Sequence, residues 1–516
     1  EIYTLSLHDA LPISTRLFFN KQSYQTGNKT LKLLRRAKLE LKRTPRNLLK
    51  FAQCLRRVEQ LYFSVENYKS KFKRLFKKYV NPKLQSLIYL TTGHPYNPSP
   101  INPNYMTSIL SFFPSMKELD INLHKVAHGG SLRIRRLKQL KVARLRSDAF
   151  KLFAAEQLAL LKLTELDIFS NDILECREIL SNVDQMQSLK KVMVIMKNTS
   201  KVIRSRELKK EDLSFIKSFY RIPIVGLDLK RDIENANDCY FYLGKLKSVK
   251  ALDLKFPGQM RKKHCVSISE AFGNMTQVRT LRLEIGDAAY DLASIGTALS
   301  KFKALKKLQL ELGIGPDNKN LFKNLNIPQL EECKIGCPLS KSHQEDGEIF
   351  GEFLGRHPEL RMLDLRINTI IPQSLKAILE GIQEYKKLEE FAFDFGVAHG
   401  FSKEEGLEGF QSLLPKLISL RVFHFKTENK VVQSEELESL LDGINQVRTL
   451  KELNFSVNLR KVDKSTFKKF VEFVREKKKS LARLEIHYNE NIKKDTKVLD
   501  QLIGRTTCPR YKSFIE

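Results

Sequence analysis

The sequence predicts an α/β solenoid in which one strand and one helix repeat along the chain. A short apolar phrase returns about fourteen times, at a mean spacing of about 28 residues. The apolar spacing changes from two residues inside each phrase to three or four between phrases, which is typical of a strand followed by a helix. Each unit buries its apolar edge only against its neighbours. We therefore expect a curved horseshoe, with parallel strands on the concave face and helices on the convex face.

The repeated phrase is a leucine, two variable residues, an apolar residue, one variable residue and another apolar residue. One copy reads Leu360-Arg-Met-Leu363-Asp-Leu365. Side chains of a strand alternate between two faces, so the last two apolar residues of each phrase should point into the core. The copies are expected to begin at Met116, Leu137, Leu163, Leu189, Ile224, Val249, Val278, Leu305, Leu330, Leu360, Leu388, Leu420, Leu450 and Leu481.

Helices are expected between the phrases. Leu375, Ile378, Leu379 and Ile382 follow Pro372 at helical spacing and form one apolar stripe. The region 437–447 repeats this stripe in a later unit. A large α/β domain with crossover helices is the alternative. It is disfavoured, because such a fold has no reason to keep one phrase at one period.

The phrase and its period resemble those of leucine-rich repeat proteins, in particular the long-repeat subfamily shared with ribonuclease inhibitor. The resemblance covers residues 84–490. Asn171, Asn368, Asn458 and Asn489 stand three places after the last apolar strand position, where that repeat expects Asn or Cys. The resemblance implies a scaffold or adaptor that binds a partner protein through its concave face. As alternatives, the resemblance implies a substrate receptor of a ubiquitin ligase or a regulator of a small GTPase.

The two ends differ from the array. Residues 1–13 resemble a translated sequencing adapter, so we exclude 1–14 from the fold and expect the rest to be a fragment. The segment 15–83 is strongly basic, with 20 Lys and Arg against three Glu between Arg16 and Lys83. It is expected to hold degenerate repeats, with a separate helical cap as the alternative. Residues 491–516 are expected to form a C-terminal cap or a truncated tail.

Composition limits the partners and the compartment. The formal net charge is +31, which alone would suggest nucleic acid or an anionic surface. Seven scattered cysteines and the lack of a long apolar run favour a reducing compartment without a membrane span, with cytoplasm as the default. The segment 15–83 is the candidate for RNA or acidic surfaces.

The repeat register assigns side chains to the concave face. The fourteen triplets assigned to it hold 14 acidic and 10 basic residues, so this face is expected to suit a basic protein or peptide. Asp120, Asp167, Asp228, Asp253 and Asp364 are expected to be exposed there. The candidate partner-binding residues are Asp120, Asp167, Asp228, Asp253, Arg282, Gln309, Lys334, Asp364, Asp394, His424, Asn454 and Glu485.

The patterns of catalytic and metal sites give no candidate. Cys333 and Cys337 lack zinc-ligand partners at suitable spacing, and Cys333 holds an apolar strand position, which favours a core thiol. The pair His264-Cys265 has no acid nearby in sequence, and no phosphate-binding loop motif is present. The sequence therefore predicts a binding protein without cofactor or metal, and no enzyme.

Overall fold

The computed structural model divides into two compact units, Glu1–Val249 and Lys250–Glu516. It describes the strand backbones at 3–6, 16–19, 36–41, 60–65 and 86–92. It further describes residues 110, 113–123, 137–147, 149, 151, 153–170, 173–196, 210–228, 236–256, 262–286, 292–313, 315, 318–339, 344–398 and 407–489. Most of the segments predicted at 1–14 and 15–83, and all of 491–516, lie outside the described residues, so those boundaries stay predictions.

The second unit is a parallel sheet whose strands follow one another in chain order. Each strand pairs with the next in register, so that Leu281 lies opposite Leu308 and Leu363 opposite Phe391. The strands are β11 (Ala251–Lys255), β12 (Thr280–Ile285), β13 (Lys307–Leu312), β14 (Glu332–Cys337), β15 (Met362–Ile370), β16 (Glu390–Ala398), β17 (Val422–Val431), β18 (Glu452–Asn458) and β19 (Arg483–Asn489).

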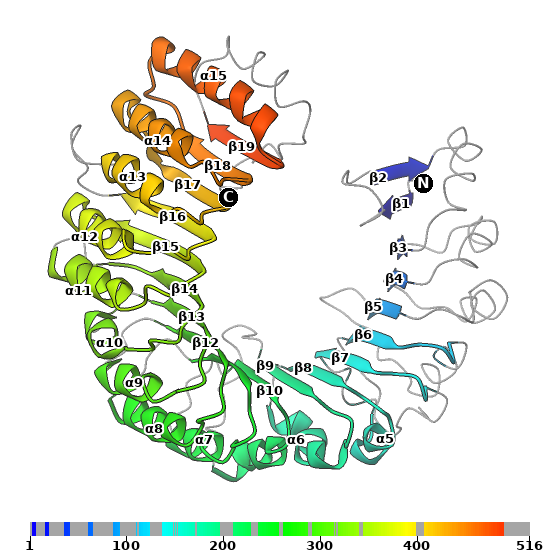
Figure 1. Cartoon of the computed structure of the whole chain (residues 1–516). Coiled ribbons are helices and arrows are strands. Elements are labelled where there is room, and N and C mark those ends of the chain that lie inside the picture. The colour runs from blue at the N-terminus through cyan, green and yellow to red at the C-terminus, as the bar shows by residue number, and fades with distance from the viewer. Residues whose placement is uncertain are drawn as a thin grey trace. The chain divides into compact units, whose positions relative to one another are not determined.

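Helices line one side of this sheet, one after each strand from β11 to β18 (Figure 1). They are α8 (Lys262–Gly273), α9 (Leu292–Leu299), α10 (Asn318–Asn324), α11 (Gln344–Gly355), α12 (Pro372–Ile382), α13 (Glu408–Leu413), α14 (Ser434–Gln446) and α15 (Lys464–Ser480). A short 3₁₀ helix, Leu414–Lys416, continues α13. The core lies between the two layers, where the apolar positions of the phrase, such as Leu281, Leu363 and Leu420, are completely buried.

Glycine sets the spacing of α11 and α12. Gly351 lies against the backbone carbonyl of Ala377, and Gly381 against that of Gly351. A Cβ at either glycine would overlap these main-chain atoms, which cannot move as a side-chain tip can. The two helices can therefore approach this closely only because both positions lack a side chain.

Two polar side chains join neighbouring repeats inside this core. The backbone N–H of Ile327 donates to Nε2 of His357 at 3.1 Å, and Nδ1 of His357 lies 2.7 Å from the carbonyl of Phe353. Because Nε2 accepts, the proton of the neutral ring sits on Nδ1 and is donated to that carbonyl. Burial lowers the pKa of His357 to about 4. One repeat later, Tyr385 Oη donates to the carbonyl of Leu354 at 2.5 Å.

The first unit repeats the parallel arrangement from β3 to β10. Its strands are β1 (Tyr3–Ser6), β2 (Arg16–Phe19), β3 (Arg36–Leu41), β4 (Gln60–Val65), β5 (Ser86–Thr92), β6 (Glu118–Leu123), β7 (Val142–Ser147), β8 (Glu165–Ser170), β9 (Lys191–Met196) and β10 (Ile224–Asp228). Strand β1 pairs antiparallel with β2 and β3. Strands β3 to β10 pair in parallel, each with the next.

Short helices follow the later strands of the first unit. They are α5 (Ala155–Ala159), α6 (Ile173–Ser181) and α7 (Ala236–Leu243), together with the 3₁₀ helices Val183–Gln185 and Lys210–Phe219. The core again consists of the phrase positions: Leu119, Ile121, Leu166 and Val192 are completely buried. The alternation of strand and helix therefore confirms the predicted α/β leucine-rich repeat solenoid in the described part of the chain.

Two of the expected phrase positions are wrong. The copy placed at Leu137 begins at Leu140, since Ala143 and Leu145 are the buried strand residues, opposite Leu119 and Ile121. The copy placed at Ile224 begins at Ile222, because Val225 and Leu227 pair with Val192 and Val194. In the first case, Leu137 and Leu140 are each followed by apolar residues three and five places later, as the phrase requires. The phrase alone does not choose between them.

Among the described helices, none is both long enough and apolar enough to cross a membrane.

Candidate binding surface

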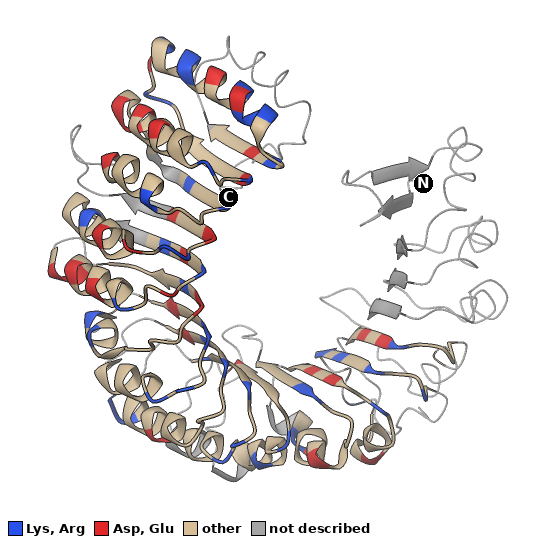
Figure 2. Ribbon diagram, in the orientation of Figure 1, with Lys and Arg blue, Asp and Glu red and all other residues tan. Residues whose placement is uncertain are grey.

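The strand face of each unit, meaning the side of the sheet away from the helices, carries the alternate side chains of every strand. On β12 the residues Leu281, Leu283 and Ile285 are buried, whereas Thr280, Arg282 and Glu284 are partly exposed. Figure 2 shows basic and acidic segments next to one another along the strands of the second unit. The strand faces are where the predicted partner-binding residues lie, and the two units are described in turn.

On the second unit, opposite charges pair between adjacent strands. Lys255 Nζ lies 2.8 Å from Glu284 Oε2, and Lys426 Nζ lies 3.4 Å from Asp394 Oδ2. Lys307 reaches Glu332 on the next strand. Because neighbouring parallel strands lie about 4.8 Å apart, a long side chain reaches the carboxylate beside it. This face therefore neutralises much of its own charge.

A glycine lies at the centre of one such network. Gly336 on β14 lies between Glu311 on β13 and Arg366 on β15, and a Cβ at Gly336 would overlap the Glu311 carboxylate. The missing side chain lets Arg366 Nη1 lie 3.9 Å from Glu311 Oε1, two strands away. Arg366 Nη2 also donates to Asp364 Oδ2 at 3.0 Å. The network crosses three strands and covers Asp364.

On the first unit, an arginine is fixed above an aromatic ring. Arg146 donates from Nε and Nη2 to the two carboxylate oxygens of Asp120, at 2.8 and 2.9 Å. Its guanidinium carbon lies 4.3 Å from the ring centre of Phe169. Arg144 Nε donates to Asp167 Oδ2 at 3.3 Å. A bidentate pair holds Arg146 in one orientation, so its contact with Phe169 is preorganised.

Next to Arg146 the charge pattern is interrupted by an apolar patch, which consists of Phe169, Met193 and Ile195. Phe169 lies opposite Ile195 across β8 and β9, and Met193 lies opposite Gly226 across β9 and β10. A Cβ at Gly226 would overlap the thioether of Met193. The glycine therefore leaves the space in which the methionine lies. All three patch residues are half-buried, and Ile224 at the start of β10 is 38% exposed.

The expected exposure of the central aspartates is wrong for four of the five. Asp120, Asp167, Asp228 and Asp364 retain 5%, 6%, 7% and 8% exposure, whereas Asp253 is half-buried. They do lie on the strand face, as predicted. Arginines on the same or the adjacent strand cover Asp120, Asp167 and Asp364. The alternation of side chains within one strand predicts the face on which each residue lies. It does not predict that a nearby arginine covers a carboxylate on that face.

Burial has an electrostatic consequence for two of these carboxyls. It raises the pKa of Asp167, against the opposing effect of Lys191 and Arg144. It also raises the pKa of Asp253, against the opposing effect of Arg282 and Lys255. Both groups are therefore less suited than free surface carboxylates to binding a cation from outside.

The remaining predicted residues also lie on the strand face, in two rows. Asp253, Arg282, Gln309, Lys334, Asp364, His424, Asn454 and Glu485 belong to the central row of the second unit. Asp394 lies in the next row, opposite Arg366 and Lys426. On the first unit, Asp228 lies in that outer row, opposite Ile195, because the phrase there begins two residues earlier than expected. Their role in binding stays a prediction.

Sequence reasoning missed the apolar patch and its arginine as site residues. The repeat register assigns Phe169, Met193 and Ile195 to the strand face as well, but all twelve candidates are polar or charged residues. Arg144 and Arg146 were lost with the misplaced phrase at Leu137. The signal for them is the reading Leu140-Lys-Val-Ala143-Arg-Leu145, which places Arg144 between two buried residues and Arg146 directly after the second.

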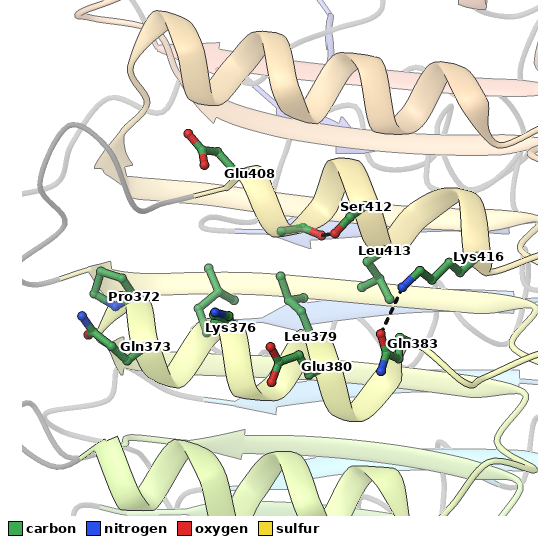
Figure 3. Close-up of a pocket in the computed structure, with 12 residues that line it drawn as sticks. Pro372, Gln373, Lys376, Leu379, Glu380, Gln383, Glu408, Ser412, Leu413 and Lys416 are labelled. Atoms are coloured by element: carbon green, nitrogen blue, oxygen red, sulfur yellow. Dashed lines mark hydrogen bonds between the residues drawn. The ribbon is translucent and has the colours of Figure 1, made fainter.

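A groove lies on the helix side of the second unit, between α12 and α13 (Figure 3). Its volume is about 550 Å³. Leu375, Leu379 and Leu413 contribute apolar side chains, and Lys416 Nζ donates to Gln383 Oε1 at 3.0 Å across it. Lys376, Glu380 and Glu408 add both signs of charge. This mixture selects no particular kind of ligand.

The two cysteines considered as zinc ligands lie in the core. Cys333 and Cys337 are completely buried, which confirms the prediction of a core thiol for Cys333. Burial raises the pKa of both thiols, that of Cys337 to about 12. Neither is a thiolate at neutral pH, and the thiolate is the nucleophilic form. Within the described residues, no group of three His, Cys, Asp or Glu side chains is placed to hold a metal ion.

No family model and no curated protein matches the chain. Among solved structures, the chain is similar to the leucine-rich repeat-containing protein LegL7 from Legionella pneumophila. The two share 14% sequence identity with a TM-score of 0.36, over 68% of this chain and 97% of that one.

Proposed function

We propose that this protein is a non-enzymatic binding scaffold whose strand face holds a partner protein, and that the first unit supplies the main contact. The observation that carries the proposal is the apolar patch of Phe169, Met193 and Ile195 beside the fixed Arg146. Binding energy at protein interfaces concentrates in a few side chains at the centre of a contact, which are enriched in aromatic residues and Arg. The thioether of Met193 adds a side chain that adapts to different partner shapes.

The arrangement of charges supports this choice between the two faces. On the second unit, a partner has to compete with ion pairs such as Lys255–Glu284 and Lys426–Asp394. Rim charges of this kind tune specificity and association rate more than affinity. On the first unit, Arg146 is already paired with Asp120, so no new desolvation of a free charge is needed beside the patch.

The partner should present an apolar anchor flanked by basic residues. The described strand face of the first unit carries five acidic and three basic side chains, and the three basic ones pair with Asp120, Asp167 and Glu165. An apolar side chain is matched to the patch, and Lys or Arg residues beside it are matched to that surplus.

A reducing compartment such as the cytoplasm fits the same proposal. Cys333 and Cys337 are buried and form no disulfide. Unpaired cysteines in a folded core are typical of proteins that fold without oxidation.

Two matched methionine variants test the proposal. Met193 and Met362 both lie half-buried on the strand face, one in the patch and one on the charge-paired second unit. Partners are captured from extract of the source cells with the wild-type chain, Met193→Glu and Met362→Glu, and are compared by quantitative mass spectrometry. Affinities are then measured with the purified partner.

Met193→Glu is expected to weaken binding at least about 30-fold, the effect of a residue worth about 2 kcal/mol. Met362→Glu is expected to stay within about threefold of wild type. Circular dichroism and melting temperature check that both variants fold. Equal binding by all three proteins, or loss only with Met362→Glu, would contradict the proposal.

A further inference from the structure

A second surface of the first unit combines exposed aromatic rings with basic side chains. It is formed by the 3₁₀ helix Lys210–Phe219, the turn after it, α7 and the turn after α7. The 3₁₀ helix packs against α7. Phe241 on α7 is 53% exposed and Tyr220 in the first turn is 43% exposed. Exposed apolar side chains indicate a contact surface when they gather in one patch with a polar rim.

Each of these rings lies next to a cation. Lys245 Nζ lies 4.7 Å from the ring centre of Phe241, and the guanidinium carbon of Arg221 lies 5.1 Å from that of Tyr220. A third pair links the two helices, since Lys217 Nζ lies 5.3 Å from the ring centre of Tyr242. Such contacts hold the cations close to the rings.

These pairs belong to one surface. The hydroxyl of Ser248 donates to the carbonyl of Tyr220, which ties the two turns together. Lys217 and Tyr242 tie the 3₁₀ helix to α7. We call this surface the basic–aromatic surface, and it consists of Lys217, Tyr220, Arg221, Phe241, Lys245 and Lys247.

Every charged side chain that the structure describes on the basic–aromatic surface is positive. Between residues 213 and 249, Asp228 carries the only carboxylate whose side chain the structure describes, and it lies on the strand face. Glu211 and Asp212 at the start of the 3₁₀ helix and Asp238 on α7 lie outside the described side chains. Lys217, Arg221, Lys245 and Lys247 are all exposed.

We propose that the basic–aromatic surface binds single-stranded nucleic acid, with its cations on the phosphates and the rings of Phe241 and Tyr220 stacked on bases. Single strands are bound by a positive surface that follows the backbone and by aromatic side chains on which bases stack. Splayed bases offer flat faces to the exposed rings, whereas a duplex hides them. This site is distinct from the strand face and does not depend on the proposed protein-binding function.

Two other anionic partners fit the surface less well. An anionic membrane needs a broad apolar face to insert, but α7 has eight residues and two exposed rings are all that the described surface offers. An acidic protein segment would use the cations but has no general need for two exposed rings. The two exposed rings therefore favour single-stranded nucleic acid over an anionic membrane and over an acidic protein segment.

The test measures binding of the full chain to a fluorescein-labelled oligouridylate of about 12 nucleotides by fluorescence anisotropy over a range of salt concentrations. Phe241→Ala and Tyr220→Ala are each expected to weaken binding about 5- to 100-fold, the usual effect of removing one stacking platform. Lys245→Ala is expected to reduce the salt slope by about 0.7, since one phosphate contact is lost. Phe241→Tyr keeps the ring and is expected to bind like wild type.

Matched controls come from the same unit. Leu160 is an exposed apolar residue and Lys162 an exposed cation, both outside this surface. Leu160→Ala and Lys162→Ala are expected to leave the affinity unchanged. The basic segment 15–83 is present in every variant, so all variants carry the same background binding from it.

Three outcomes would overturn the inference. One is an affinity that falls with Lys245→Ala but not with Phe241→Ala or Tyr220→Ala, which indicates a general polyanion site. Another is equal loss with the Leu160 and Lys162 controls. The third is binding of vesicles rich in phosphatidylserine, reduced by Phe241→Ala, without any effect of that variant on the oligonucleotide.

Discussion

The strands of the two units share the same rows of buried apolar residues, but the side chains on their strand faces differ. On the second unit, charges such as Lys426 and Asp394 pair between adjacent strands. On the first unit, the ladder of charges is interrupted by Phe169, Met193 and Ile195, and one arginine is locked beside them. The comparison teaches that a repeat period fixes where side chains point, while the few positions that depart from the common pattern determine where a partner can bind.

The largest predicted difference between the units is in acid stability. Burial lowers the pKa of His357 in the second unit to about 4, against an ordinary value of 6.5. Between these values the unfolded chain binds a proton that the folded chain does not. Stability is therefore lost as the pH falls from about 6.5 towards 4, by about 2–3 kcal/mol at pH 4.5. Among the described side chains of the first unit there is no histidine to add a similar effect.

His357→Gln is the matched variant, because its amide can still accept from Ile327 and does not titrate. Urea unfolding at pH 7 and pH 4.5 should show a smaller loss in this variant than in wild type. Hydrogen exchange, resolved by peptide, should place the extra loss of protection within residues 250–489. An acid response that is the same in both proteins would refute this assignment.

A smaller difference is expected between charge pairs on the two faces. Arg146→Ala leaves the buried carboxylate of Asp120 without its two charge-assisted hydrogen bonds, which should cost about 2 kcal/mol of stability. Lys307→Ala removes the partner of Glu332, but these side chains are 51% and 34% exposed, so the cost should be below about 1 kcal/mol. Chemical denaturation of both variants gives the comparison. Equal losses would mean that Arg146 is not fixed as described.

Much of the architecture could be predicted because the phrase combines two periodicities that few folds share. The alternation of Leu363 and Leu365 with Asp364 gave the strand and its faces correctly. The stripe from Leu375 to Ile382 predicted the helix α12, which begins at Pro372. Two copies were misplaced where a second leucine or isoleucine, Leu140 or Ile222, offered an equally good start.

The details of the surface could not be predicted because they depend on neighbours distant in sequence. The burial of Asp120 requires Arg146, which lies 26 residues away and reaches it across two paired strands. The position of Met193 depends on the missing side chain of Gly226 on the next strand. A single repeat shows neither relation. The basic–aromatic surface likewise combines residues of two elements, linked by Lys217 and Tyr242.

Site-specific photocrosslinking tests the central claim about the two faces most directly. Benzoylphenylalanine is placed at position 193 in one protein and at position 362 in another, and both are irradiated in extract of the source cells. The account predicts a specific protein adduct at position 193 that an excess of wild-type chain suppresses, with little adduct at position 362. Adducts of equal strength at both positions, or an adduct at position 362 alone, would contradict the assignment of the partner to the first unit.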